Sequence, residues 1–230
     1  MIAPQIRMLY NPQLKGAYNF VPGVMAMILI IISAMMTSVS IVREKEINTM
    51  QVLLVSPLKP LLFILSKAIP YMFLSLVNVS TILIVSVTLL EVPINGSLLL
   101  VMLEALLFIT RAVSLGLMIS NVTSSQQTAQ MISLLGLVLP TLYLGGFMFP
   151  IESMPKPLQF ISNFVPSKWF FIIVKNAKIK GLGFRMIWKE TLILLGMIFF
   201  FYRSVCQNLK FGWHETIIFF TGERIPAEIS

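Results

Sequence analysis

Charged residues are scarce in this chain of 230 residues, where they make up only 11% of the sequence. A soluble globular domain carries about 25% charged residues, so this chain has too little charge to cover a water-facing surface. Hydrophobic residues make up 57%, and the mean hydropathy is +0.89. The composition therefore indicates a membrane protein.

Cysteine and histidine are nearly absent, since Cys206 and His214 are the only residues of their types. One cysteine excludes an intrachain disulfide and a cysteine-based metal site. One histidine excludes an HExxH zinc site, and the chain has no GxxxxGK[ST] phosphate-binding loop. No nucleophile–base set stands out either, which argues against an intramembrane enzyme. We expect no catalytic residues, no directly bound cofactor and no metal site.

The charge that is present is mostly positive, with 17 Lys and Arg against 9 Asp and Glu. In a membrane protein, basic residues flank the spans and meet anionic lipid headgroups. No basic segment is interleaved with exposed aromatic residues, as a nucleic-acid site would require. We expect the lipid bilayer as a partner and no nucleic acid.

Long apolar runs dominate what the sequence does contain. A helix needs about 20 apolar residues to cross a bilayer. Five runs approach or exceed this length: 21–42, 61–90, 98–120, 131–149 and 187–202. They predict about five transmembrane helices. Basic residues divide almost evenly between the two sides that five spans define, so the positive-inside rule leaves the orientation open.

Segment 43–60, REKEINTMQVLLVSPLKP, follows the first run without a linker. Its first four residues are charged and alternate in sign, and Ile47, Met50, Leu54 and Leu58 then recur at helical spacing. This pattern is typical of an amphipathic helix at the membrane surface. Two interpretations remain open: an interfacial helix that turns the chain, or a docking element for a soluble partner.

Segment 146–170 lies between the fourth and fifth runs and is too apolar for an ordinary surface loop. Prolines at positions 150, 155, 157 and 166 exclude one straight helix. Irregular backbone is tolerated at membrane depth where protein covers it or where it lines an aqueous cavity. Two interpretations therefore remain open for this segment: irregular backbone that enters the membrane, or a strained connector.

Two ionisable residues, Glu104 and Arg111, fall inside the third run. They are seven residues apart, and therefore lie on one face of a helix. Intramembrane charges are costly and are by default candidates for function. Both a place on a translocation path and a role in helix assembly remain open for them.

Three stretches, read together, resemble one family. VREKEINTMQVLLVSPLKP resembles the signature of type-2 ABC exporter permeases, although Asn48 replaces the glycine of the family's run. YNPQLKGAYNFVPG at 10–23 is similar to what precedes the next span in that family. GFMFPIESMPKPLQFISNFVP at 146–166 resembles its extracytoplasmic hairpin. The three matches follow the family's order and spacing over about residues 9–200.

This resemblance implies an all-α membrane fold: about five transmembrane helices, an interfacial coupling helix and a proline-broken re-entrant helical hairpin. The coupling helix would contact a separate ATPase subunit. The residues implied there are Arg43, Glu44, Lys45, Glu46, Thr49 and Met50. The hairpin would form a gate over the translocation path, with Phe149, Pro150, Met154 and Pro155 at the gate.

The resemblance also implies a function: the membrane-spanning permease subunit of an ATP-driven exporter for small hydrophobic or amphipathic cargo. ATP and Mg would be bound by the partner ATPase, and a second permease subunit would complete a homo- or heterodimer. The expected location is multi-pass in a cell membrane, with the bacterial inner membrane favoured.

The implied domains are the end of an extracytoplasmic region at 1–20, a permease domain at 21–206 and an unassigned tail at 207–230. The family's N-terminal span and extracytoplasmic domain have no counterpart here. The alternative expectation is therefore a truncated or non-transporting assembly protein derived from such a permease.

Overall fold

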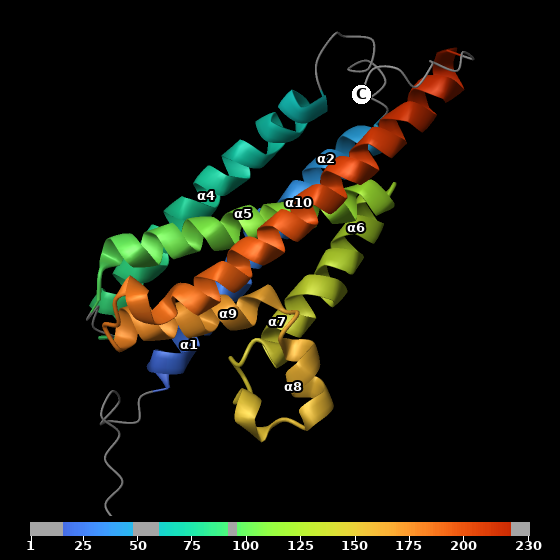
Figure 1. The fold of residues 1–230 in the computed structure, drawn as a ribbon. Helices are drawn as coiled ribbons and strands as arrows, with labels where there is room; N and C mark the ends of the chain where they lie inside the picture. The colour runs from blue at the N-terminus through green and yellow to red at the C-terminus, as the bar shows by residue number, and fades with distance from the viewer. Residues whose placement is uncertain (1–15, 48–59, 92–95, 222–230) are drawn as a thin grey trace, which may run out of the picture.

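The computed structural model describes residues 16–47, 60–91 and 96–221, and every regular element in these ranges is helical (Figure 1). The α-helices are α1 Ala17–Ile30, α2 Met36–Glu46, α4 Pro60–Thr88, α5 Leu98–Val122, α6 Gln126–Ser133, α7 Leu139–Leu144, α8 Lys156–Ser162, α9 Pro166–Val174 and α10 Phe184–Thr221. Three π-helical segments, η1 Ile31–Met35, η2 Leu134–Val138 and η4 Lys175–Ile179, and the 3-10 turn η3 Ile151–Ser153 complete the set. The expected all-α class is confirmed.

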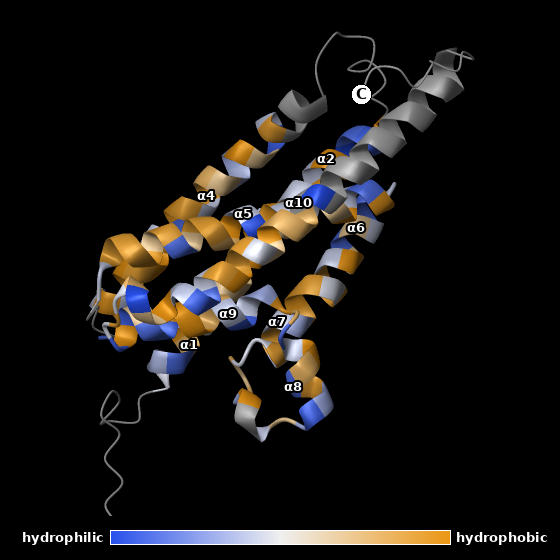
Figure 2. Cartoon of the chain, in the orientation of Figure 1, coloured by the Kyte–Doolittle hydropathy of each residue, from blue (hydrophilic) through white to orange (hydrophobic). Residues whose placement is uncertain are grey.

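Four helical stretches in the described residues are long and apolar enough to cross a membrane. They are Tyr18–Glu46, Leu65–Thr88, Leu98–Val122 and Gln126–Leu144. Figure 2 shows hydrophobic residues along most of α4, α5 and the first half of α10. The fifth predicted run, 187–202, lies within α10, and this helix continues through residues 207–221 of the predicted tail.

The fourth span differs from its predicted bounds of 131–149. Its helix starts at Gln126, five residues before the predicted run, and ends at Leu144. The start is stabilised from a distance, because the backbone N–H of Gln126 donates to Glu46 Oε2 at 3.1 Å. The end coincides with a glycine pair, of which Gly146 has a φ of 80° that disfavours other residues.

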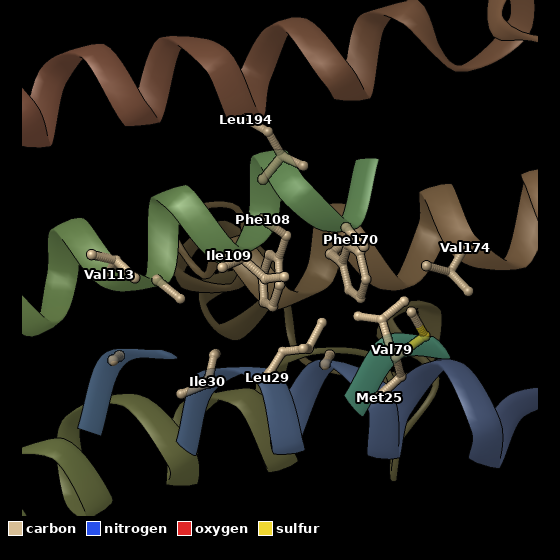
Figure 3. Close-up of a cluster of buried hydrophobic side chains, with 14 of the residues drawn as sticks. Met25, Leu29, Ile30, Val79, Phe108, Ile109, Val113, Phe170, Val174 and Leu194 are labelled. Atoms are coloured by element: carbon tan, nitrogen blue, oxygen red, sulfur yellow. The ribbon is translucent and has the colours of Figure 1, made fainter. Parts of the chain in front are cut away.

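Helix α5 lies at the centre of the bundle, where it packs against α1, η1, α2, α4, α9 and α10. Figure 3 shows its Phe108 and Ile109 between Leu29 and Ile30 of α1, Phe170 of α9 and Leu194 of α10. The rings of Phe108 and Phe170 stack with centroids 4.2 Å apart. The apolar faces of several helices therefore meet on one helix, and α9 is part of that core.

A glycine sets how closely α5 approaches the first span. A Cβ atom built on Gly116 would lie 2.3 Å from the carbonyl oxygen of Ala34, within the π-helical segment η1. That contact is with backbone, which cannot move aside as a flexible side chain could. A matched control exists in α10, because a Cβ on Gly196 would meet nothing within 4 Å.

Gly116→Ala is expected to lower the free energy of unfolding by about 1–3 kcal/mol, as overpacking does in a tight core. Gly196→Ala is expected to leave it unchanged or slightly higher, since alanine favours a helix. Thermal unfolding of both variants in detergent, followed by circular dichroism, makes the comparison. Equal midpoints for the two variants would contradict the close approach of α5 to η1.

Candidate functional site

The charged REKE run forms the last turn of the first membrane helix. The structure places Arg43, Glu44, Lys45 and Glu46 in α2, continuous with the span that begins at Tyr18. The predicted surface helix over 43–60 therefore starts no earlier than the residue after Glu46. Positions 48–59 lie outside the described residues, and with them Thr49 and Met50 of the predicted coupling set.

Three of the four charges are bonded to three different helices. Glu44 forms an ion pair with Lys67 of α4. The Lys45 ammonium donates to the carbonyl oxygen of Ser120 near the end of α5. Glu46 Oε2 accepts from the backbone N–H of Gln126 in α6, and from its side-chain Nε2 at 2.8 Å. We call these three contacts of Glu44, Lys45 and Glu46 the motif clamp.

The contact of Glu46 also caps α6. The first N–H groups of a helix have no partner within the helix, and a carboxylate there interacts favourably with the helix dipole. Ser125, at the N-cap position, makes no capping bond with its side chain, so Glu46 supplies the acceptor. In contrast, Arg43 is exposed, which leaves its charge facing away from the bundle.

The predicted gate residues lie at the edge of the structure. Phe149, Pro150 and Pro155 are exposed, and Met154 is half-buried. The ring of Phe149 stacks on that of Tyr143 in α7, with centroids 6.3 Å apart. These four residues flank the 3-10 turn η3, in the connection between α7 and α8 that Figure 1 shows.

The buried half of the proline-broken segment begins at Val165, three residues after the end of α8. Pro166 takes the first position of α9, where its missing N–H costs nothing. Ser167 Oγ lies 2.7 Å from Thr141 Oγ1 of α7. Sequence reasoning missed this contact, although Pro166 followed by an apolar stretch was the available signal of a helix start.

A buried lysine follows in η4, outside the four candidate spans. Lys178 is fully buried, and its ammonium donates to Ser86 Oγ of α4. Burial lowers the pKa of Lys178 to about 8. This contact joins η4, which follows the proline-broken segment and α9, to the second span.

Glu104 and Arg111 both face α10 and are almost fully buried, at 2% and 1% exposed. Glu104 Oε1 lies 2.7 Å from Thr191 Oγ1. The Arg111 guanidinium carbon lies 4.0 Å from the centroid of the Phe201 ring. The prediction that they share a helix face is confirmed, whereas the sequence offered no signal for their partners Thr191 and Phe201.

Reversing either charge of the Glu44–Lys67 pair is expected to destabilise the bundle by about 1 kcal/mol, because each single reversal places like charges together. The double variant Glu44→Lys with Lys67→Glu is expected to recover the unfolding midpoint, since it restores opposite charges. Thermal unfolding in detergent at low ionic strength is the measurement. A double variant as unstable as the sum of the single ones would refute the pairing.

Comparison with known proteins identifies the family. The model of the family described as "ABC-2 family transporter protein" matches residues 2–203. The probable multidrug ABC transporter permease YbhS of Escherichia coli K12 is 30% identical over 216 residues, which cover 94% of this chain and 55% of that protein. YbhR of the same strain, which has the same description, is 32% identical over 190 residues, 83% of this chain and 51% of YbhR.

A third relative is the inner membrane transport permease YhhJ of Escherichia coli K12, 30% identical over 206 residues that cover 87% of this chain and 54% of YhhJ. The chain thus spans about half the length of the curated relatives it matches. No solved structure matches it significantly. Because the family model matches residues 2–203 of the 230, the chain belongs to the ABC-2 family of transporter proteins.

Proposed function

We propose that this chain is a membrane-spanning permease subunit of an ATP-driven exporter, and that the motif clamp passes the movement of a partner ATPase to the membrane helices. The carrying observation is the clamp itself, in which one charged turn is bonded to α4, α5 and α6. Family membership and four apolar helices support the permease assignment.

The proposed transfer of movement from the ATPase to the membrane helices follows from the order of the segments along the chain. The rest of segment 43–60, which resembles a coupling helix, follows Glu46 directly. A push on that segment displaces the last turn of α2. Because Glu44, Lys45 and Glu46 bond three other helices, movement of that turn exerts a force on these helices. Rigid-body movement of packed helices is a common way to convert a local displacement into a larger change.

In this proposal, an ATPase subunit supplies the energy and a second permease subunit completes the translocation path. The sequence contains no phosphate-binding loop, so ATP and Mg belong to an ATPase subunit. The apolar windows of the spans Leu65–Thr88 and Gln126–Leu144 are only 22% buried, against 50% and 56% for Tyr18–Glu46 and Leu98–Val122. The two less buried spans therefore have apolar faces available to the bilayer and to a second permease subunit.

The proposed cargo is a small hydrophobic or amphipathic molecule. YbhS and YbhR are described as probable multidrug ABC transporter permeases, and this supports the proposed class of cargo. We assign Glu104 and Arg111 to assembly rather than to contact with cargo, because both face α10 and are almost fully buried. The proline-broken segment is proposed as the gate, with its anchored half in α9.

The test is co-purification of the tagged chain from its host membranes in mild detergent, with ATP hydrolysis measured in the eluate. Arg43→Glu is expected to reduce the recovered ATPase several-fold while leaving the unfolding midpoint unchanged, since Arg43 is exposed and outside the motif clamp. The double reversal Glu44→Lys with Glu46→Lys is expected to reduce both quantities, with membrane insertion intact.

The matched control is the charge-swapped pair Glu44→Lys with Lys67→Glu, which keeps the ion pair and is expected to retain more ATPase than Glu44→Lys alone. ATPase recovery that is indifferent to Arg43→Glu would refute docking at this turn. Clean recovery of the chain without any ATPase would favour the alternative, a non-transporting assembly protein derived from a permease.

A further inference from the structure

A polar site that the proposed transport mechanism does not use lies between α5 and α10. Glu104 projects from α5 and is 2% exposed, and its Oε2 atom has no hydrogen-bond partner. Glu190 lies in α10, and its Oε2 atom is also buried without a partner. The negative charge of Glu190 is close enough to act on Glu104. Two carboxyl groups on packed helices thus each have a buried oxygen without a partner.

The hydroxyl group of Thr191 lies between two acceptors but has one hydrogen to donate. Its Oγ1 lies 2.7 Å from Glu104 Oε1 and 3.0 Å from the carbonyl oxygen of Ile187. A hydroxyl group has a single hydrogen to donate, and both neighbours are acceptors when Glu104 is ionised. A proton on Glu104 removes the conflict, because the carboxyl O–H then donates to Thr191, which donates to Ile187.

The charges around the site do not supply a counter-ion. Of the charged groups in the described residues, Glu190 is the one that acts on Glu104. Arg111 is seven residues further along α5, about 10 Å at 1.5 Å per residue, and lies over the Phe201 ring. Within the described residues, the cations on the other packed elements are engaged or exposed: Lys168 donates to Asn163, Lys178 donates to Ser86, Lys175 lies over the Phe171 ring, and Arg185 and Lys189 are exposed.

The charges of α2 and of the start of α4 lie at the opposite end of α5, where Glu44, Lys45 and Glu46 form the motif clamp and Arg43 is exposed. An ionised carboxylate in an apolar interior without a partner is costly, and two neighbouring ones cannot both ionise cheaply. Either a proton or a cation must therefore complete the site. The single hydrogen of Thr191 favours the proton, because a bound cation would leave the competition between its two acceptors unrelieved.

We propose that Glu104 is a proton-binding site, in which its carboxyl group keeps one proton at neutral pH and donates it to Thr191 across the α5–α10 interface. Release of that proton leaves two negative charges on facing helices, and no counter-ion for them lies among the described residues. The contact of α5 with α10 is therefore dependent on the proton. This inference does not depend on an ATPase partner, so it stands or falls separately from the proposed function.

Infrared spectroscopy of the purified chain in lipid vesicles tests the site directly, because a protonated carboxyl group has a C=O stretching band apart from the carboxylate bands. The unmodified chain is expected to show this band at neutral pH and to lose it as the pH rises. Glu104→Gln is expected to abolish the band. The matched control, Glu44→Gln, removes a carboxylate that is paired with Lys67 and is expected to leave the band unchanged.

Two further variants keep the test decisive if Glu104→Gln fails to fold. Glu190→Gln is expected to lower the pH at which the band disappears, by about one unit, because it removes the neighbouring negative charge. Thr191→Val is expected to keep the band and to raise its frequency, because the hydrogen-bond acceptor is lost. Absence of the band at neutral pH, as a bound cation would produce, overturns the proposal, and so does a band that none of these variants alters.

Discussion

A few polar side chains of this molecule have partners on other helices, whereas many hydroxyl groups bond only to carbonyls of their own helix. A buried polar atom without a partner costs about 1–3 kcal/mol, so each such group fixes the position of the helix that satisfies it. Ser33 Oγ, for example, lies 2.8 Å from Ser75 Oγ and joins the first span to the second. Apolar packing on α5 holds the helices together, and these sparse polar contacts determine their register.

The polar contacts gather at two levels of the bundle. At one end, the motif clamp joins α2 to α4, α5 and α6. Toward the other, Ser167 meets Thr141, Ser162 Oγ donates to the Leu144 carbonyl, and Lys178 donates to Ser86. The Glu104 site lies between α5 and α10, which pack together along their length. A displacement at the clamp therefore enters a bundle whose helices are connected at more than one level.

The sequence predicts the elements better than it predicts their connections. Runs 21–42 and 98–120 could be recognised because an apolar stretch of that length has one main use. The start of α6 at Gln126 could not, since its cap comes from Glu46, 80 residues away in the chain. Thr191 was missed for the same reason, since its partner Glu104 is 87 residues distant.

The sequence predicted which residues form the candidate site, but only partly which way they face and what they contact. The charges of REKE were expected to face a soluble partner, yet Glu44, Lys45 and Glu46 are bonded within the bundle. Alternating charges on one turn point in several directions, and only the packed neighbours decide which of them face inward. The prolines likewise indicated a broken segment, but which half is buried depends on the aromatic contact of Phe170 with Phe108.

The motif clamp predicts that α2 and the helices it contacts move together. Covalent cross-linking tests it most directly: Glu46→Cys with Gln126→Cys, in a Cys206→Ser background, joined by a short bifunctional reagent in the complex with the ATPase. If the clamp moves as a unit, ATP hydrolysis by the cross-linked complex equals that of the uncross-linked one. Hydrolysis that stops on cross-linking, and returns when a cleavable linker is cut, would show that α2 and α6 must separate and would contradict the account.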